Sequence, residues 1–340
     1  MFNFDYSYLS LPSKLYSKTK PSINHLSEIF ISNHKLYNDL NINDNGEKLI
    51  EELLKKKYYK KTFAQAYAGH QFGHFTKLGD GRAIILGEHI TNQNKRFDIQ
   101  LKGGGKTKYS RNGDGKATLG SMLREYLISE TMHYLKIPTS RSLALIKTGE
   151  IINRVSEEDG SILVRVMKSH LRIGTFEYAA YFGSSDDLKK ITSYSIKRLY
   201  PEIETSETPA LKLLEIVMKQ QINLVVNWMR VGFIHGVINT DNTSITGESF
   251  DYGPCAFMNS YDPLKTYSSI DYNGRYAFGN QPNIIKWNIF RFAEALLPLI
   301  DKNKETSIQK AQSIVDKFDK IWEKKYYSMM LKKIGIKNYK

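Results

Sequence analysis

Apolar and polar positions divide the chain into an earlier part with strand-like patterns and a later part with helical ones. Residues 83–90 read AIILGEHI and residues 96–101 read RFDIQL, with the polar turn TNQNK between them. Short runs of β-branched and apolar residues on either side of a polar turn predict a β-hairpin. Further apolar runs at 142–148, 150–156 and 161–167 predict more strands of an antiparallel sheet.

Helical spacing first becomes clear in the segment that follows this hairpin. Apolar residues recur three and four positions apart over 118–135, and Pro138 lies just beyond, so the pattern predicts a helix that ends before the proline. Among the first 60 residues, 22–31 and 47–59 have amphipathic patterns that predict helices. After Gly174 most of the chain is predicted to be helical, over 174–182, 185–198, 209–232, 285–300 and 305–332.

These patterns predict an α+β fold in three parts. We expect a helical N-terminal extension over 1–60, a small sheet-containing lobe over 61–175 and an α-rich lobe over 176–340. A length of 340 residues suits two lobes of ordinary size. The longest apolar stretch, 222–234, is interrupted by polar residues, so it predicts a buried helix and no membrane span.

Composition narrows the classes of protein. The formal net charge of +14 permits a polyanionic partner, yet lysines are dense only at 55–61 and 317–340 and no recognition motif accompanies them, so we expect no nucleic-acid partner. The single cysteine, Cys255, excludes an internal disulfide and a Cys-rich metal site. The N-terminal residues lack the pattern of a secretory signal, which predicts a cytoplasmic protein.

Candidate chemistry begins with a glycine-rich turn, a lysine and a glutamate. Gly79 and Gly81 precede the first strand of the hairpin, where glycines let backbone N–H groups approach phosphates closely. Lys102 ends the second strand, and Glu125 lies in the helix that follows. A strand lysine paired with a helix glutamate is the arrangement with which protein kinases hold a lysine on nucleotide phosphates.

Two oxygen-bearing residues follow the long helix expected at 209–232. Asn242 ends the string GVINTDN, and Asp251 begins the string DYG; their oxygens are the ligands that Mg²⁺ prefers. In a protein kinase the catalytic base is the aspartate five residues before such an asparagine, but here that position holds Val237, which cannot accept a proton. Asp241 is the nearest replacement.

Two arginines complete the set of candidate residues. Arg165 and Arg172 lie seven positions apart in the string LVRVMKSHLRIGTFE, and arginine binds phosphate oxygens through two parallel hydrogen bonds without losing its charge. They therefore suit a terminal phosphate or a leaving pyrophosphate, although surface ion pairs remain an alternative use for either one.

The chain resembles the selenoprotein O or YdiU family of protein adenylyltransferases. The resemblance is carried by YAGHQFGHF (67–75), LGDGRA (78–83), QLKGGGKTKYSRNGDGKATLGSMLREYL (100–127), SHLRIGTFE (169–177), GVINTDNTSITG (236–247), DYGPCAFM (251–258), YDP (261–263) and GRYAFGNQP (274–282).

This resemblance implies an atypical protein-kinase-like fold in which ATP is bound in the reverse orientation. A Ser, Thr or Tyr hydroxyl of a protein substrate would attack the α-phosphate, and pyrophosphate would leave. The implied metal is Mg²⁺ or Mn²⁺, and related members are thought to transfer UMP from UTP as well. The roles that the family assigns fall on Gly79, Gly81, Arg82, Lys102, Asp114, Gly115, Arg165, Arg172 and Asp251 for ATP, on Asn242 and Asp251 for the metal, and on Asp241 as proton acceptor; Glu125 orients the lysine.

Two other functions fit parts of this pattern. The family usually continues past the position of Lys340, so a C-terminally short member could be a nucleotide-binding regulator without catalysis. A Ser/Thr protein kinase with a displaced base is the other alternative, and Val237 argues against it.

Overall fold

The computed structural model describes residues 2–44 and 46–336 and consists of two compact units. The first unit comprises Met1–Tyr67 and Lys77–His170, and the second comprises Ala68–Thr76 and Leu171–Lys340. The strands lie mainly in the first unit and the long helices mainly in the second, so the expected α+β class is confirmed.

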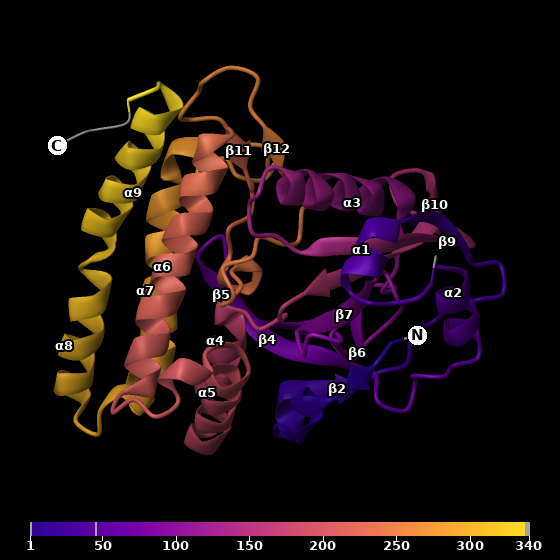
Figure 1. The fold of residues 1–340 in the computed structure, drawn as a ribbon, viewed down its shortest axis with the longest axis horizontal. Helices are drawn as coiled ribbons and strands as arrows, with labels where there is room; N and C mark the ends of the chain where they lie inside the picture. Colours follow the sequence, from indigo (N-terminus) through magenta and orange to yellow (C-terminus); the bar gives the residue numbers. More distant parts are fainter. Residues whose placement is uncertain (1, 45, 337–340) are drawn as a thin grey trace. The chain divides into compact units, whose positions relative to one another are not determined.

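Within the described residues the principal sheet has ten strands. The strands along its main path pair in antiparallel fashion (Figure 1). The hairpin and the later strands expected from the sequence are present, although the runs at 142–148 and 150–156 form one long strand. Along the path the order is β2 (Tyr16–Lys18), β4 (Phe63–Gln71), β6 (Ala83–Ile90), β7 (Arg96–Lys102), β10 (Glu157–Met167), β9 (Arg141–Asn153) and β3 (Glu28–Ser32), while β1 (Phe4–Asp5), β5 (His74–Gly79) and β8 (Ala117–Thr118) pair with β6, β4 and β10.

The first 60 residues differ from the helical extension that the pattern predicted. The segment expected as a helix over 22–31 contains strand β3, which pairs with β9, and two further short strands lie before it. The run EIFIS is rich in β-branched and aromatic residues, and pairing with the edge of the sheet outweighs its weak helical spacing. The expected helix at 47–59 is shorter, α2 (Glu47–Leu54), and is preceded by α1 (His34–Asp39).

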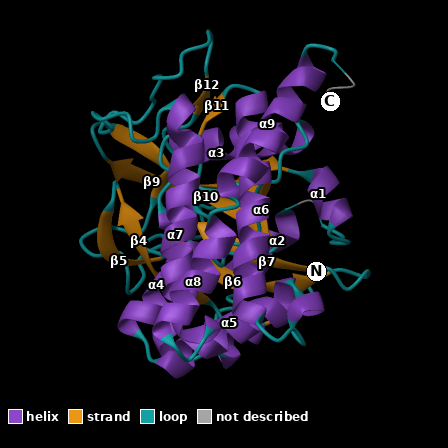
Figure 2. Cartoon of the chain, turned by 90° about the vertical axis from the view of Figure 1, so that its left-hand side faces the viewer, coloured by secondary structure: helices purple, strands orange, loops and turns teal. Residues whose placement is uncertain are grey.

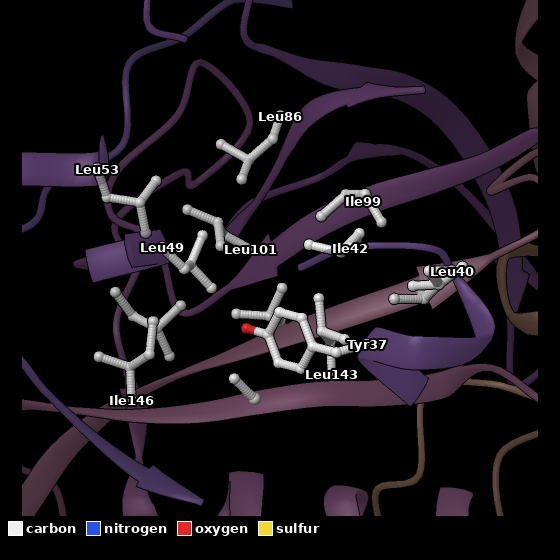
Figure 3. Packing of buried hydrophobic residues seen from close by; sticks show 14 of the residues in the cluster. Tyr37, Leu40, Ile42, Leu49, Leu53, Leu86, Ile99, Leu101, Leu143 and Ile146 are labelled. Carbon is white, nitrogen blue, oxygen red and sulfur yellow. The ribbon is translucent and has the colours of Figure 1, made fainter. Parts of the chain in front are cut away.

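Both faces of the sheet in the first unit are covered by helices. Tyr37 of α1, Leu49 of α2 and Ile146 of β9 belong to one buried cluster, as Figure 3 shows. The neighbouring Leu145 points to the opposite face, where it packs against Met122 of α3 (Leu119–Tyr134). Each fully buried side chain of this size stabilises the fold by roughly 1.5–3 kcal/mol. The end of β7 and the middle of α3 are thereby fixed to one rigid layer.

The second unit is built from helices and a short two-stranded sheet (Figures 1 and 2). The helix expected at 305–332 is divided into two at Asp316 and Lys317, where no glycine or proline marks the break. None of the helices in the described residues is both long and apolar enough to span a membrane. The elements are α4 (Ile173–Phe182), α5 (Ser185–Leu199), α6 (Pro209–Arg230), β11 (Phe233–Ile234), β12 (Ala256–Phe257), α7 (Gln281–Ile300), α8 (Lys304–Val315) and α9 (Phe318–Lys333). Short 3-10 turns lie at Ser7–Ser10, Ser13–Leu15, Pro201–Ile203, Thr240–Asn242 and Phe278–Asn280.

Candidate active site

A buried cluster of three charged side chains lies in the first unit. Lys102 Nζ is 2.6 Å from Glu125 Oε2, and Arg165 Nε donates to Glu125 Oε1 at 2.9 Å. Arg165 also donates from Nη1 to Gln100 Oε1 at 3.1 Å, which fixes the plane of its guanidinium. The ion pair between Lys102 and Glu125 that the sequence predicted is therefore present, and Arg165 shares the same carboxylate.

The location of this cluster follows from the sheet register. Lys102 is the last residue of β7 and lies opposite Ala83 of β6 on one side and Leu163 of β10 on the other. The side chains of Lys102, Glu125 and Arg165 are almost completely buried. Two cations share the Glu125 carboxylate in a region of low dielectric. A phosphate group placed against them would accept charge-assisted hydrogen bonds.

The glycine-rich turn of the first unit packs closely against the loop that follows β7. Gly79 has φ +154°, and a Cβ at that position would lie 2.3 Å from the ring of Tyr109. Thr107 Oγ1 donates to the carbonyl oxygen of Asp80 at 2.7 Å. Gly115 has φ +73°, and a Cβ there would lie 2.2 Å from the backbone of Gly105. Only glycine permits both approaches, so the turn packs tightly against the Tyr109 ring and the loop folds tightly on itself between Gly105 and Gly115.

Two further candidates of the first unit are accessible to solvent. Arg82 is exposed. Asp114 accepts hydrogen bonds from Arg154 Nη1 and Nη2 at 2.9 Å each, and this pairing with Arg154 lowers the pKa of the Asp114 carboxyl. A polar cavity of about 270 Å³ lies beside Asp114 and is also lined by Gly105 and Lys116.

Asp241 is the central candidate of the second unit. It lies in the 3-10 turn Thr240–Asn242, and its side chain is only 6% exposed. Gln71 Nε2 donates to its Oδ2 at 3.4 Å, and Arg172 Nη1 donates to its backbone carbonyl at 3.2 Å. Its Oδ1 has no hydrogen-bond partner among the described residues. The Asp241 carboxylate therefore has an acceptor site that no described donor uses.

Burial raises the pKa of Asp241 to about 7, while the positive charge of Arg172 opposes the shift. Arg172 is itself buried, and its guanidinium lies 5.0 Å from the centre of the Phe250 ring. A carboxyl with a pKa near neutrality exchanges a proton readily at physiological pH, as a general base must.

The residues expected to hold a metal offer amide and carboxylate oxygens, the donor atoms that Mg²⁺ prefers. Asn242 Nδ2 donates to the carbonyl of Val237 at 3.0 Å, so the amide is oriented and its Oδ1 is turned away from that bond. Asp251 has a left-handed backbone with φ +63°, and its charge acts on Asp241, which places the two carboxylates near one another. Within residues 2–44 and 46–336 no group of three or more His, Cys, Asp or Glu is arranged to hold a metal. Two protein oxygens completed by phosphate and water are typical of Mg²⁺.

The tip of the hairpin between β4 and β5 was missed by the reasoning from sequence. His70 N donates to Thr240 Oγ1 at 2.8 Å, and Phe72 N donates to Asn239 Oδ1 at 3.3 Å. A Cβ on Gly69 would lie 2.3 Å from Asp241 Oδ1. The tip therefore covers the turn that carries Asp241. The string YAGHQFGHF (67–75) contributes to the family resemblance, but neither it nor its two glycines show what the tip contacts.

Replacing Gly69 with alanine is expected to lower the rate of the nucleotidyl transfer that the family resemblance implies roughly 100-fold, because the added methyl group would displace the Asp241 carboxylate by about an ångström. Single-turnover kinetics with saturating nucleotide measure the effect. Gly120→Ala is the matched control, since a Cβ there meets nothing within 4 Å, and it should retain the wild-type rate. A wild-type rate in Gly69→Ala would show that Asp241 does not depend on this close packing.

Comparison with known proteins identifies the family of this chain. Several relatives carry the name protein nucleotidyltransferase YdiU. The one from Pelagibacter ubique is 52% identical, and the match covers 98% of this chain and 70% of the relative. The one from Brevibacillus brevis is 51% identical, and the match covers 99% of this chain and 70% of the relative. The relative of Clostridium perfringens is 49% identical over 98% and 69%. These relatives are enzymes of the nucleotidyltransferase class. The model of the family described as protein adenylyltransferase SelO matches residues 1–340, and the chain belongs to that family.

Solved structures with a similar fold are far more distant. A rhoptry antigen kinase domain of Toxoplasma gondii is 10% identical, with a TM-score of 0.30 over 78% of this chain and 88% of that one. A virulence factor of the same organism, with a protein-kinase fold and no enzymatic activity, is 12% identical, with a TM-score of 0.33 over 87% and 96%. Superpositions this loose support no inference about the site.

Proposed function

We propose that this chain transfers AMP from ATP to Ser, Thr or Tyr hydroxyls of protein substrates and releases pyrophosphate. The observation that carries the proposal is the buried Asp241, whose Oδ1 has no partner among the described residues, next to a position at which a kinase base is replaced by Val237. The hydroxyl oxygen forms a bond to the α-phosphorus as the bond to the β-phosphate oxygen breaks. The carboxylate of Asp241 takes the hydroxyl proton.

The cations of the chain are assigned to the phosphates in this proposal. Lys102 and Arg165, which are both held by Glu125, would bind the β- and γ-phosphates. Negative charge grows on the pyrophosphate as it leaves, and preorganised cations stabilise that charge. Arg172 is assigned to the phosphates as well. The remaining nucleotide contacts are assigned to Gly79, Gly81, Arg82, Asp114 and Gly115.

Asn242 and Asp251 would hold the metal, Mg²⁺ or Mn²⁺, through their oxygen atoms. A divalent ion supplies charge neutralisation and orientation of the phosphates. UTP is a second candidate nucleotide, with transfer of UMP in place of AMP.

The proposal is tested by comparing ATP labelled at the α- or the γ-phosphate, with Mg²⁺ and a mixture of candidate protein substrates. We expect the α-label to become protein-bound and the γ-label to remain in pyrophosphate. Asp251→Ala should lower the rate of α-label transfer at least about 100-fold, because the metal that neutralises the phosphates would lose one of its ligands. Asp186→Ala is the control, since Asp186 is an exposed residue of α5 in the same unit.

The two labels also separate the other functions. Transfer of the γ-label would show a protein kinase and would overturn the proposal. Tight binding of ATP in calorimetry, without transfer of either label, would show a nucleotide-binding regulator.

A further inference from the structure

Three aromatic side chains form an exposed surface on the second unit. Phe75 follows the hairpin tip, and Tyr181 and Phe182 lie at the end of α4; they are 38%, 59% and 40% exposed. The ring of Phe75 lies 4.9 Å from that of Tyr181 and is stacked on Phe182 at 5.9 Å. We refer to these three residues as the aromatic surface. A cluster of large aromatic side chains that is exposed on the protein surface typically marks a binding site.

The aromatic surface is connected to the turn that carries Asp241. The ring of His70 lies 4.9 Å from that of Phe75, and its Nδ1 is 2.6 Å from Glu177 Oε1. The backbone N–H of the same His70 donates to Thr240 Oγ1 at 2.8 Å, and Thr240 directly precedes Asp241. A polypeptide with its hydroxyl at Asp241 therefore has the aromatic surface within a few residues' reach.

Arginine side chains lie beside this connection. Trp287 of α7 packs against His70 with ring centres 5.0 Å apart, and the guanidinium of Arg275 lies 4.7 Å from the Trp287 ring. Arg291 contacts the same ring at 5.1 Å but is paired with Glu294. Among the described residues no carboxylate forms an ion pair with Arg275, which is partly exposed. It is thus a cation held in place by aromatic rings and open to an external carboxylate.

We propose that the aromatic surface and Arg275 together bind the acceptor protein. The acceptor segment would place an apolar or aromatic side chain on Phe75, Tyr181 and Phe182 and a carboxylate against Arg275, with its hydroxyl at Asp241. Tyrosine, tryptophan and arginine are the residues that contribute most to binding in protein interfaces. The inference rests on the proposed function, which requires a protein hydroxyl at this turn, and it names acidic and apolar residues as the features that the enzyme selects.

The test uses a library of synthetic 15-residue peptides, each with one central threonine and varied flanking positions, together with α-labelled ATP. We expect the wild type to prefer peptides with acidic and aromatic flanking residues. Tyr181→Ala should raise KM for the preferred peptides roughly fivefold to tenfold with little change in kcat. Arg275→Glu should reverse the charge preference from acidic to basic residues, which loss of folding alone would not do. Tyr327→Ala on α9 is the control, because Tyr327 is also 59% exposed, and it should behave as the wild type.

The outcomes separate this inference from the proposed function. The wild type could label peptides while both variants keep its KM and its sequence preference. That result would overturn the assignment of the aromatic surface and Arg275 to acceptor binding, and it would leave the proposed transferase activity intact. If the wild type labels no peptide and no protein, the proposed function fails, and the inference fails with it. If a single-stranded oligonucleotide binds the wild type, loses binding in Tyr181→Ala and Arg275→Glu, and the peptide kinetics are unchanged, the surface serves nucleic acid and the inference is overturned.

Discussion

Replacing Asp241 with asparagine is expected to lower the rate of AMP transfer about 10²- to 10⁴-fold, the usual contribution of a general base. Asparagine has nearly the same volume and shape but cannot take the hydroxyl proton. Because Arg172 contacts the backbone carbonyl of Asp241, the turn itself should keep its hydrogen bonds. Nucleotide affinity should therefore change by no more than about threefold, since the lost interaction acts on the transition state.

Single-turnover transfer of the α-label and calorimetric titration with ATP measure the two quantities separately. Glu177→Gln is the matched control, because Glu177 is another buried carboxylate of the same unit and is paired with His70. It should lower stability and keep most of the transfer rate. If Asp241→Asn transferred AMP as fast as the wild type, another group would have to accept the proton.

The ion pair of Lys102 and Glu125 could be predicted from sequence because both residues belong to elements with clear patterns. Lys102 and Glu125 are only 23 positions apart, and the helix that contains Glu125 packs on the sheet to which the strand ending in Lys102 belongs. The second ion pair of the same carboxylate, between Arg165 and Glu125, could not be predicted. It depends on the register that pairs Arg165 of β10 with Gln100 of β7, and register is set by the whole sheet.

Contacts between residues far apart in the sequence explain the other differences between the predicted and the observed structure. The β3 strand was predicted as a helix because its partner β9 lies more than 100 positions later, and pairing with that edge decides its conformation. The hairpin tip 69–73 has no local pattern that indicates its contact with Thr240, 170 positions away from His70. Glycines mark such positions but do not identify what approaches them, so the cover over Asp241 could be found only in three dimensions.

Replacing Glu125 with alanine is expected to lower the free energy of unfolding by about 3–5 kcal/mol, the typical cost of removing one partner from a buried ion pair. Glu125 is the carboxylate shared by Lys102 and Arg165, and all three side chains are almost completely buried. Its removal leaves two cations without their shared counter-ion inside the first unit, and water cannot replace the carboxylate without opening the packing between α3 and the sheet.

Urea denaturation followed by circular dichroism measures this change. Glu51→Ala is the control, since Glu51 forms an exposed ion pair with Lys55 in the same unit and its loss should leave the midpoint almost unchanged. Added ATP and Mg²⁺ should recover part of the loss in Glu125→Ala if phosphates bind Lys102 and Arg165, because a ligand that binds only the folded state stabilises it. An unchanged midpoint in Glu125→Ala would mean that solvent reaches the cluster and that its charges are not confined, which would also remove the reason to place the phosphates there.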